Sequence, residues 1–571
     1  LTSVRKHLAF PKTSWQICCL AILGGIASAL CVILFTLTID FIQSFYITER
    51  NDYSSLAAIK RFILPILGAV VILLLAWLTG YKYLRTGIPF ILHRLKVAHG
   101  LIPIKNTLNQ FWGSAVALSS GFSVGQEGPA VHLGAACSGA VGHYLRLPHN
   151  SIRTLAACGV AAGISATFNT PIAAVIFVME VILREYKVHV FIPVMLASLV
   201  GSLITSNFFN ISHDFSYFVK VDLNNQYYLF LLVLSVVIGI LSSIFNRFLV
   251  FIIAQSSGIH IVKRLIFAAI VTGFIGFFVP RAMGTDTNVF NLVLIEHWPI
   301  GLLLSLLLAK LVMTTFALGL GIPGGIVGPT LSIGALTGAC IGVIAVQLSP
   351  GEHVVSDFIL MGMTGFMAAS LNAPLAALLA IVELSGQLEI IVPAMFVITI
   401  SSIISGQIFK NRSIFTMQLD VQGLKYRTPP IEKALQSIGV SALMKKDYKI
   451  IEHINNNEIL TNSFTQNEYN KLIIKEKKKG FQEGELENIT NCQFSLIQLN
   501  EGIKTVNFDD KDIQLLLLEV ISEQATLAQA YSTMMKQQCS ALVVYSPQKC
   551  VSGIIYQKDI TTYLERGKLV K

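Results

Sequence analysis

Long runs of apolar residues alternate with short, interrupted ones along the first 425 residues of the chain. A helix needs about 20 predominantly apolar residues to cross the hydrocarbon core of a bilayer. Four runs reach that length, at residues 15–46, 62–84, 226–255 and 388–408. The pattern therefore predicts an all-α, polytopic membrane body.

Between these runs the apolar segments are shorter, and glycine and proline interrupt them. Such segments lie at residues 87–98, 105–123, 129–145, 153–166 and 171–184. Most of them are too short to cross a bilayer unaided. A break in the backbone at membrane depth is tolerated where it is buried in protein or lines a cavity. Many broken helices therefore indicate a polar pathway through the body.

The interruptions occur in pairs that are separated by about 200 residues. The two members of each pair have the same sequence pattern. The first pair is a Gly-x-x-Gly-Pro turn, the second is an Asn-x-Pro turn, and the third is an acidic residue nine positions after the proline of the second. The pairs are 125–129 with 325–329, 168–171 with 371–374, and Glu180 with Glu383. Their offsets of 200, 203 and 203 predict two homologous halves, roughly 15–220 and 221–425. Paired interrupted segments indicate a substrate site at the interface between the two halves.

The Gly-x-x-Gly-Pro turns suit the start of a helix, because proline is favoured at the first helical position and glycine permits close approach. A helix N-terminus carries unsatisfied N–H groups and a partial positive charge, so it binds anions. The alternative is that these glycines only let helices pack closely. The candidate anion-binding residues in such turns are Thr86, Gly87, Ile88, Gly125, Gln126, Gly325, Ile326 and Val327.

Glu127 is an ionisable residue inside an interrupted apolar segment, at the start of a predicted helix. A carboxylate at membrane depth is costly and is a functional-site hypothesis by default. When charged it can occupy the anion site as a tethered competitor, and when protonated it would leave. Glu127 is therefore the candidate gate and a candidate proton carrier. The alternative is a carboxylate that only caps its own helix.

Composition supports the membrane interpretation and divides the chain. Hydrophobic residues make up 53% and charged residues only 13%, and the mean hydropathy is +0.66. These values exclude an ordinary soluble protein and a disordered one. Residues 427–571 nevertheless hold 18 Lys/Arg and 17 Asp/Glu. The net charge of +10 lies mostly among apolar segments, which favours juxtamembrane positive charge over a nucleic-acid-binding face.

The charge distribution predicts three regions. Residues 1–14 form a short segment whose Arg5, Lys6 and Lys12 indicate a cytoplasmic N-terminus. Residues 15–425 form the transmembrane domain, and residues 426–571 form a cytoplasmic tail. We expect a multi-pass protein of the plasma or inner membrane with both termini in the cytoplasm.

Other chemistry has little support in the sequence. The nine cysteines form no CxxC pair, and neither a Ser/His arrangement nor HExxH occurs, so we expect no metal site, no required cofactor and no enzyme. His132, near Glu127, is assigned to local packing.

The body resembles the CLC family of chloride channels and chloride/proton exchangers. The matching stretches are residues 86–89 (TGIP), 125–129 (GQEGP), 324–329 (GGIVGP), and 168–171 (FNTP) running on to Glu180. The resemblance covers roughly residues 15–425. It implies an inverted repeat of about 18 membrane helices, a homodimer with one anion path in each subunit, and chloride as the transported ion. It also places Glu127 on the family's gating glutamate.

The resemblance is imperfect at the site. Thr86 stands where the family usually has Ser, and Gln126 where it usually has Arg or Lys. Val327 replaces a usual Phe. Phe415 aligns with the inner-gate Tyr, so the resemblance makes it an anion-site residue without the hydroxyl donor.

The difference between channel and exchanger depends on the residue after Glu180. Exchangers typically carry a second Glu there as the internal proton relay, and this chain has Val181. Glu180 itself remains and is a tentative proton-pathway residue together with Glu127. We therefore expect chloride conduction by a channel gated by Glu127, with the voltage gating that the family's channels show. The alternative is coupled chloride/proton exchange with Glu127 as the external proton carrier.

The tail resembles the CBS modules that many CLC proteins carry in pairs. A weak first module lies near residues 438–512, where 475–479 read as a solvated loop, and a clearer second lies near 513–571. In the second we expect a helix from 523 to about 538, strands at 541–545 and 551–555, and a last helix opening at Asp559. Paired CBS domains often bind adenine nucleotides, with an acid on the ribose. Asp559 is that candidate, but a purely structural dimer contact is the favoured interpretation of the tail.

Overall fold

The structure is a computed structural model of the chain. It describes residues 5, 8–10, 13–47, 51–80, 87–209, 225–284, 299–348, 354–424, 434–446, 448–452, 471–477, 492–498, 514–546 and 550–566. The chain divides into two compact units. The membrane unit comprises Ile17–Val141 and Arg153–Arg427, and the C-terminal unit comprises Leu1–Gln16, Gly142–Ile152 and Thr428–Lys571.

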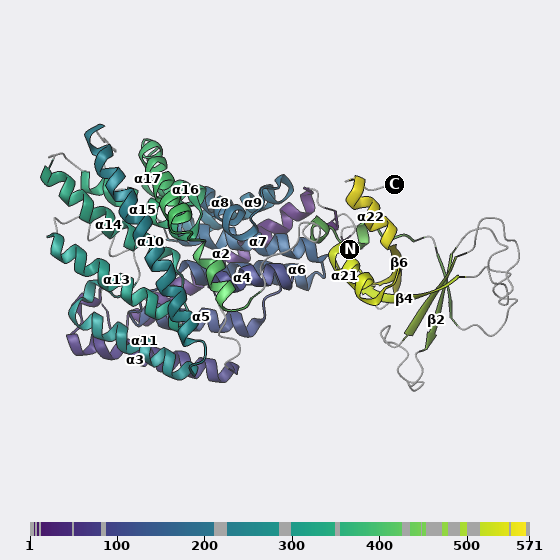
Figure 1. The fold of residues 1–571 in the computed structure, drawn as a ribbon. Coiled ribbons are helices and arrows are strands. Elements are labelled where there is room, and N and C mark those ends of the chain that lie inside the picture. The colour runs from purple at the N-terminus through teal and green to yellow at the C-terminus, as the bar shows by residue number, and fades with distance from the viewer. Residues whose placement is uncertain are drawn as a thin grey trace, which may run out of the picture. The chain divides into compact units, whose positions relative to one another are not determined.

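The described part of the membrane unit is helical (Figure 1). Its first helices are α2 (Trp15–Gln43), α3 (Ala58–Thr79), α4 (Gly87–Val97), α5 (Ile104–Ser119), α6 (Glu127–Tyr144), α7 (His149–Phe168), α8 (Pro171–Phe177) and α9 (Val188–Phe209). The later ones are α10 (Tyr228–Ser256), α11 (Ile261–Phe278), α13 (Ile300–Leu320), α14 (Val327–Leu348), α15 (Val354–Leu371), α16 (Pro374–Ser385), α17 (Ile391–Ile403) and α18 (Ile414–Val421). Short π-helical segments, Val178–Leu183 and Ile404–Ile408, extend α8 and α17.

The predicted spans agree with helices α2, α3, α10 and α17. Among the described residues, ten helices are long and apolar enough to cross a membrane. The segment at 153–166 was expected to be too short to cross a bilayer. That expectation was wrong, because the segment belongs to the 20-residue helix α7, which is long enough to span. The hydropathy pattern missed its first turn because that turn is polar. The fold class, a helical polytopic membrane protein with a small α/β region, is confirmed.

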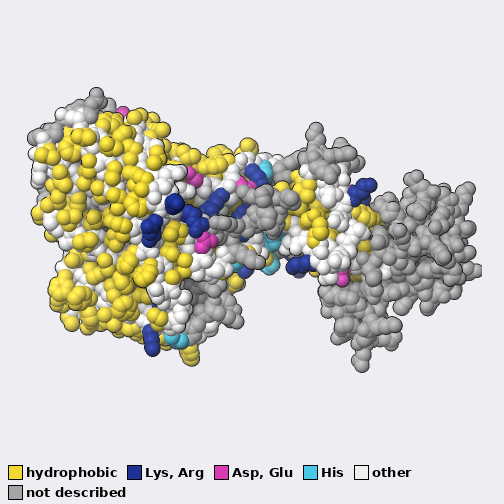
Figure 2. Space-filling view, viewed as in Figure 1, with side chains coloured by type: hydrophobic (Ala, Val, Ile, Leu, Met, Phe, Trp, Pro, Cys, Tyr) yellow, Lys and Arg dark blue, Asp and Glu magenta, His cyan; other side chains and the backbone are white. Residues whose placement is uncertain are grey.

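Apolar side chains cover the outside of the membrane unit. Figure 2 shows hydrophobic residues over most of the visible face of this unit. Large exposed side chains lie on α2 and α3, including Leu30, Leu34, Leu67 and Trp77. Exposed apolar area of this extent is unfavourable in water and favourable against lipid.

The two halves repeat their helix packing as well as their motifs. A Cβ atom at Gly134 of α6 would lie 2.1 Å from the Gly159 carbonyl oxygen of α7. Its counterpart at Gly334 of α14 would lie 2.4 Å from the Gly362 carbonyl oxygen of α15. Small residues at such contacts let membrane helices approach closely. The internal repeat therefore extends from the turns into the helix pairs that follow them.

The C-terminal unit contains a six-stranded sheet in the order β1-β2-β3-β4-β5-β6. The strands are β1 (Lys449–Glu452), β2 (Lys471–Lys477), β3 (Cys492–Gln498), β4 (Gln514–Ser522), β5 (Ala541–Tyr545) and β6 (Val551–Tyr556). The pairs β1/β2 and β4/β5 are parallel, and the other three pairs are antiparallel. Helices α21 (Leu527–Gln537) and α22 (Gln557–Arg566) complete it.

Most predicted elements of the tail occur near their expected places, as α21, β5, β6 and α22. A capping box between Thr526 and Gln529 begins α21, and Leu527, Leu542 and Ile560 pack in the core beside it. The expected loop at 475–479 was wrong in part, because Lys475–Lys477 lie in β2, paired with β3. Cross-strand pairing there overrides the low strand propensity of lysine and glutamate.

Candidate anion pathway

The two Gly-x-x-Gly-Pro turns contact each other through their backbones. The Gly125 amide donates to the Gly325 carbonyl at 2.8 Å, and the Gly325 amide donates to the Gly125 carbonyl at 2.7 Å. These residues occupy the same place in the two repeats. A Cβ atom at Gly325 would lie 2.5 Å from the Gly128 nitrogen, so only glycine permits this approach. The starts of α6 and α14 are thus fixed side by side.

Glu127 is the first residue of α6 and lies between these turns. Its side chain is 5% exposed, and Oε2 accepts the amide hydrogen of Gly328 at 3.1 Å. Gly328 belongs to the first turn of α14, so the carboxylate from one repeat lies on the helix N-terminus of the other. The partial positive charge of that N-terminus stabilises a negative group. The carboxylate therefore occupies a place that suits an anion.

A cavity of about 720 Å³ brings together several predicted anion-site residues. Gly87, Ile88, Gly325, Ile326 and Phe415 line it. Gln418 of α18 and Gln422, which follows that helix, also line the cavity. We call it the tail-side cavity, because α18 is the last membrane-unit helix before the tail in the sequence. The cavity is also lined by Gly128, the residue after Glu127, and by Gly324, which lies in the turn just before α14.

Not every candidate lies on this cavity. Gly125 and Gln126 are outside both cavities described in this subsection. The Gly87 amide donates to the Gln110 side chain at 2.8 Å, so it is already engaged. Sequence reasoning missed Gln110, which no motif marks. Thr86 lies outside the described residues.

Comparison with known proteins identifies the family of the chain. A family model described as "voltage gated chloride channel" matches residues 81–406. The chain belongs to this family, the CLC family. It is 26% identical to an H(+)/Cl(-) exchange transporter, ClcA of Klebsiella pneumoniae subsp. pneumoniae, over 463 residues, which are 76% of this chain and 95% of that protein.

Solved structures show the same fold. A slow cyanobacterial Cl-/H+ antiporter matches with a TM-score of 0.64 at 17% identity, covering 71% of this chain and 97% of its own. A CLC-type fluoride/proton antiporter matches with a TM-score of 0.60 at 21% identity, with the same coverage of 71% and 97%. A eukaryotic CLC transporter matches with a TM-score of 0.60 at 17% identity, and covers 95% of this chain and 98% of its own. The protein is thus a multi-pass CLC transporter.

A second, smaller cavity of this CLC protein is lined by Glu127 itself. It measures about 30 Å³, and its walls are mostly apolar. Glu127, Ile88 and Val327 line one end, and Ala173 and Ala376 line the other. Both cavities are lined by Ile88, and Glu127 of the small cavity is followed by Gly128 of the tail-side cavity. The volume is enough for about one water molecule.

Glu180 and its repeat counterpart Glu383 each hold a helix of the opposite repeat. Glu180 accepts the Ala376 amide at 2.8 Å and the Leu375 amide at 3.3 Å, at the start of α16. Glu383 accepts the Ala173 and Ile172 amides at 2.7 and 2.9 Å, at the start of α8. These contacts satisfy N–H groups that a helix start leaves open. Glu180 is therefore a helix cap, and its part in proton transfer stays a prediction.

His132 and Arg264 are two further ionisable residues near the candidate path. The His132 ring is fully buried and stacks on Phe90, with centroids 5.7 Å apart and planes 9° apart, in keeping with the packing role expected for it. Arg264 of α11 lines the tail-side cavity. Sequence reasoning missed Arg264, because α11 is far from the motifs in the sequence.

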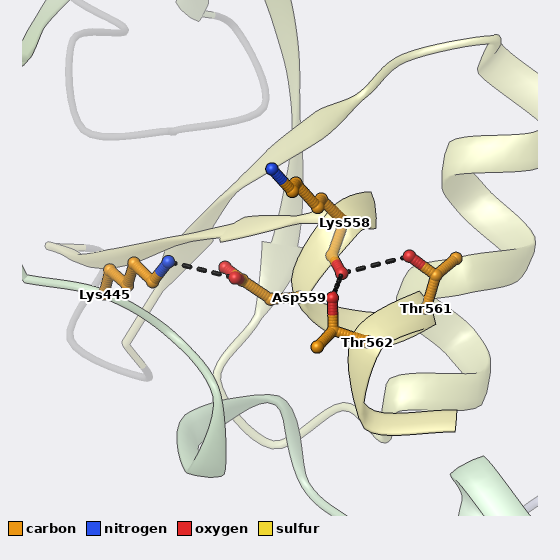
Figure 3. A network of polar contacts seen from close by, with 5 residues as sticks. All are labelled: Lys445, Lys558, Asp559, Thr561 and Thr562. Atoms are coloured by element: carbon orange, nitrogen blue, oxygen red, sulfur yellow. Dashed lines mark hydrogen bonds and ion pairs between the residues drawn. The ribbon is translucent and has the colours of Figure 1, made fainter. Parts of the chain in front are cut away.

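In the C-terminal unit, Asp559 lies at the start of α22. Its Oδ1 pairs with Lys445 Nζ at 2.9 Å (Figure 3). Lys445 Nζ also lies over the Tyr556 ring, 5.7 Å from its centroid. The neighbouring hydroxyls of Thr561 and Thr562 donate to the Lys558 carbonyl rather than facing Asp559. A nucleotide using Asp559 would therefore have to displace Lys445.

Proposed function

We propose that this CLC protein exchanges chloride for protons, with Glu127 as the group that competes with chloride and carries the proton. One observation supports this most: the buried Glu127 carboxylate lines the small cavity and accepts the Gly328 amide hydrogen, while its neighbour Gly128 lines the tail-side cavity. The exchange activity in the name of the Klebsiella relative also favours it over passive conduction.

The cycle follows from the two states of the carboxylate. Charged, Glu127 lies on the N-terminus of α14 and excludes chloride from that place. Protonated, it loses most of its attraction to the helix N-terminus, so chloride can replace it. Chloride approaches through the tail-side cavity, and the proton leaves through the small apolar cavity toward Ala376 and Glu180. Separate routes that meet at one carboxylate couple the two fluxes.

The second candidate function is a passive chloride channel. Val181 favours it, because this buried side chain follows Glu180 and has no proton to transfer. In that function Glu127 would still open and close the path, but no proton would cross.

Purified protein in liposomes distinguishes the two. An imposed chloride gradient should drive protons uphill, recorded as a pH change inside the vesicles. A reversal potential at the chloride equilibrium value, with no proton movement, would instead establish the channel. We further propose a homodimer with one path per subunit, termini in the cytoplasm, and adenine nucleotide as a ligand of the tail.

A further inference from the structure

Arg264 is held in place by the end of a neighbouring helix. Its Nε donates to the carbonyl of Leu320, the last residue of α13, at 3.1 Å. Gly321 follows with a φ of +102°, and a Cβ atom there would lie 3.2 Å from Nη2. The C-terminus of a helix carries partial negative charge and stabilises a cation. One edge of the guanidinium is therefore fixed against α13.

Arg264 is also a lining residue of the tail-side cavity. Arg264 is the one ionisable side chain among its described lining residues, whose other polar side chains are Ser257, Gln418 and Gln422. The ion pairs found in the described part of the chain involve other residues, so Arg264 has no carboxylate partner there. The same cavity contains Ile326 and Phe415 of the candidate anion site. A positive charge thus lies in the space leading to that site.

We propose that Arg264 concentrates chloride in the tail-side cavity and so sets the chloride concentration at which transport from that side saturates. This inference rests on the anion transport proposed above, but not on its coupling to protons. A unit charge about 8 Å away, at an effective dielectric of about 40 to 80, changes the local anion concentration about two- to sixfold. An attraction of this size raises occupancy without trapping the ion.

The test uses the full-length protein in liposomes, with chloride varied on each side in turn. Arg264→Gln should raise the half-saturating chloride concentration about two- to sixfold on one side and leave it unchanged on the other. Arg264→Lys should restore it. The matched control is Lys263→Gln, since Lys263 is the next residue, is exposed, and is not among the cavity's lining residues. The difference between wild type and Arg264→Gln should shrink as an impermeant salt is added, because salt screens the charge.

A merely structural role would give another pattern. If Arg264 only caps α13, Arg264→Gln lowers the maximum rate or the stability and leaves the half-saturating concentration unchanged, which would overturn the proposal. If Arg264→Gln does not fold, Ser257→Lys tests the proposal instead, because it adds a cation to the same cavity. It should lower the half-saturating concentration, whereas Ser257→Gln should not, and an unchanged value would also overturn the proposal.

Proton movement is recorded in the same vesicles. Chloride flux without proton movement would reject the exchange mechanism and leave the Arg264 test intact. Absence of chloride flux in the wild type would reject the proposed function itself.

Discussion

Glu127 of the first repeat accepts a hydrogen bond from Gly328 of the second, at 3.1 Å. The two residues are 201 positions apart in the sequence. The contact depends on the glycine turns, since Gly125 and Gly325 exchange hydrogen bonds beside it. A side chain that can be charged or neutral thus lies on a helix end that prefers the charged form. This relationship makes the gate testable.

Glu127→Gln keeps the size of the side chain and removes its charge. The neutral amide should leave the α14 N-terminus more readily, by up to about 2 kcal/mol, or roughly 30-fold in occupancy. We expect faster chloride flux at neutral pH, little dependence of that flux on pH, and no proton movement. Flux and pH recordings on liposomes check this. Proton pumping that persists in the variant would remove Glu127 from the proton path.

Gly325→Ala tests the close approach of the two turns. Its Cβ atom would lie 2.5 Å from the Gly128 nitrogen, and backbone cannot move aside as a flexible side chain does. We expect a loss of stability of about 3 kcal/mol or more, together with loss of transport. Gly301→Ala is the control, because nothing lies within 4 Å of the added atom. Thermal unfolding in detergent should show that variant at or slightly above wild type.

Glu180→Gln and Glu383→Gln form a matched pair. Each weakens a cap on a helix of the opposite repeat, so each should cost about 1–2 kcal/mol of stability. Only Glu180→Gln should also reduce proton movement, because Glu180 is next to Val181, where exchangers of the family carry the relay acid. If both variants pump protons as wild type does, Glu180 is a cap alone.

The nucleotide hypothesis makes a prediction about the Lys445–Asp559 ion pair. Side-chain exposures of 51% and 22% make this a surface pair that contributes at most about 1 kcal/mol. Lys445→Gln should therefore raise the affinity for adenine nucleotide by up to about fivefold, since Asp559 no longer has to be released. Asp559→Asn should lower it at least tenfold. Equal binding of ATP by wild type and Asp559→Asn, measured by calorimetry, would exclude Asp559 as the ribose ligand.

The sequence alone predicted the membrane body, the repeat and the importance of Glu127. Those inferences depend on local signals: hydropathy, the positions of glycine and proline, and a carboxylate in an apolar segment. Arg264 and Gln110 were missed for the same reason. Neither lies in a motif, and their hydrogen bonds to Leu320 and Gly87 form only when the chain folds.

The sequence by itself thus determined which helices begin at glycine-proline turns that suit an anion. It also determined that both halves of the membrane body contain such turns. Only the tertiary structure decided which helix start donates hydrogen bonds to each acidic side chain. Glu127, Glu180 and Glu383 each contact a helix start in the opposite half, 195 to 211 residues away. Local pattern cannot specify such pairing, because it arises when two similar halves pack together and each supplies the charge that the other's unsatisfied N–H groups require.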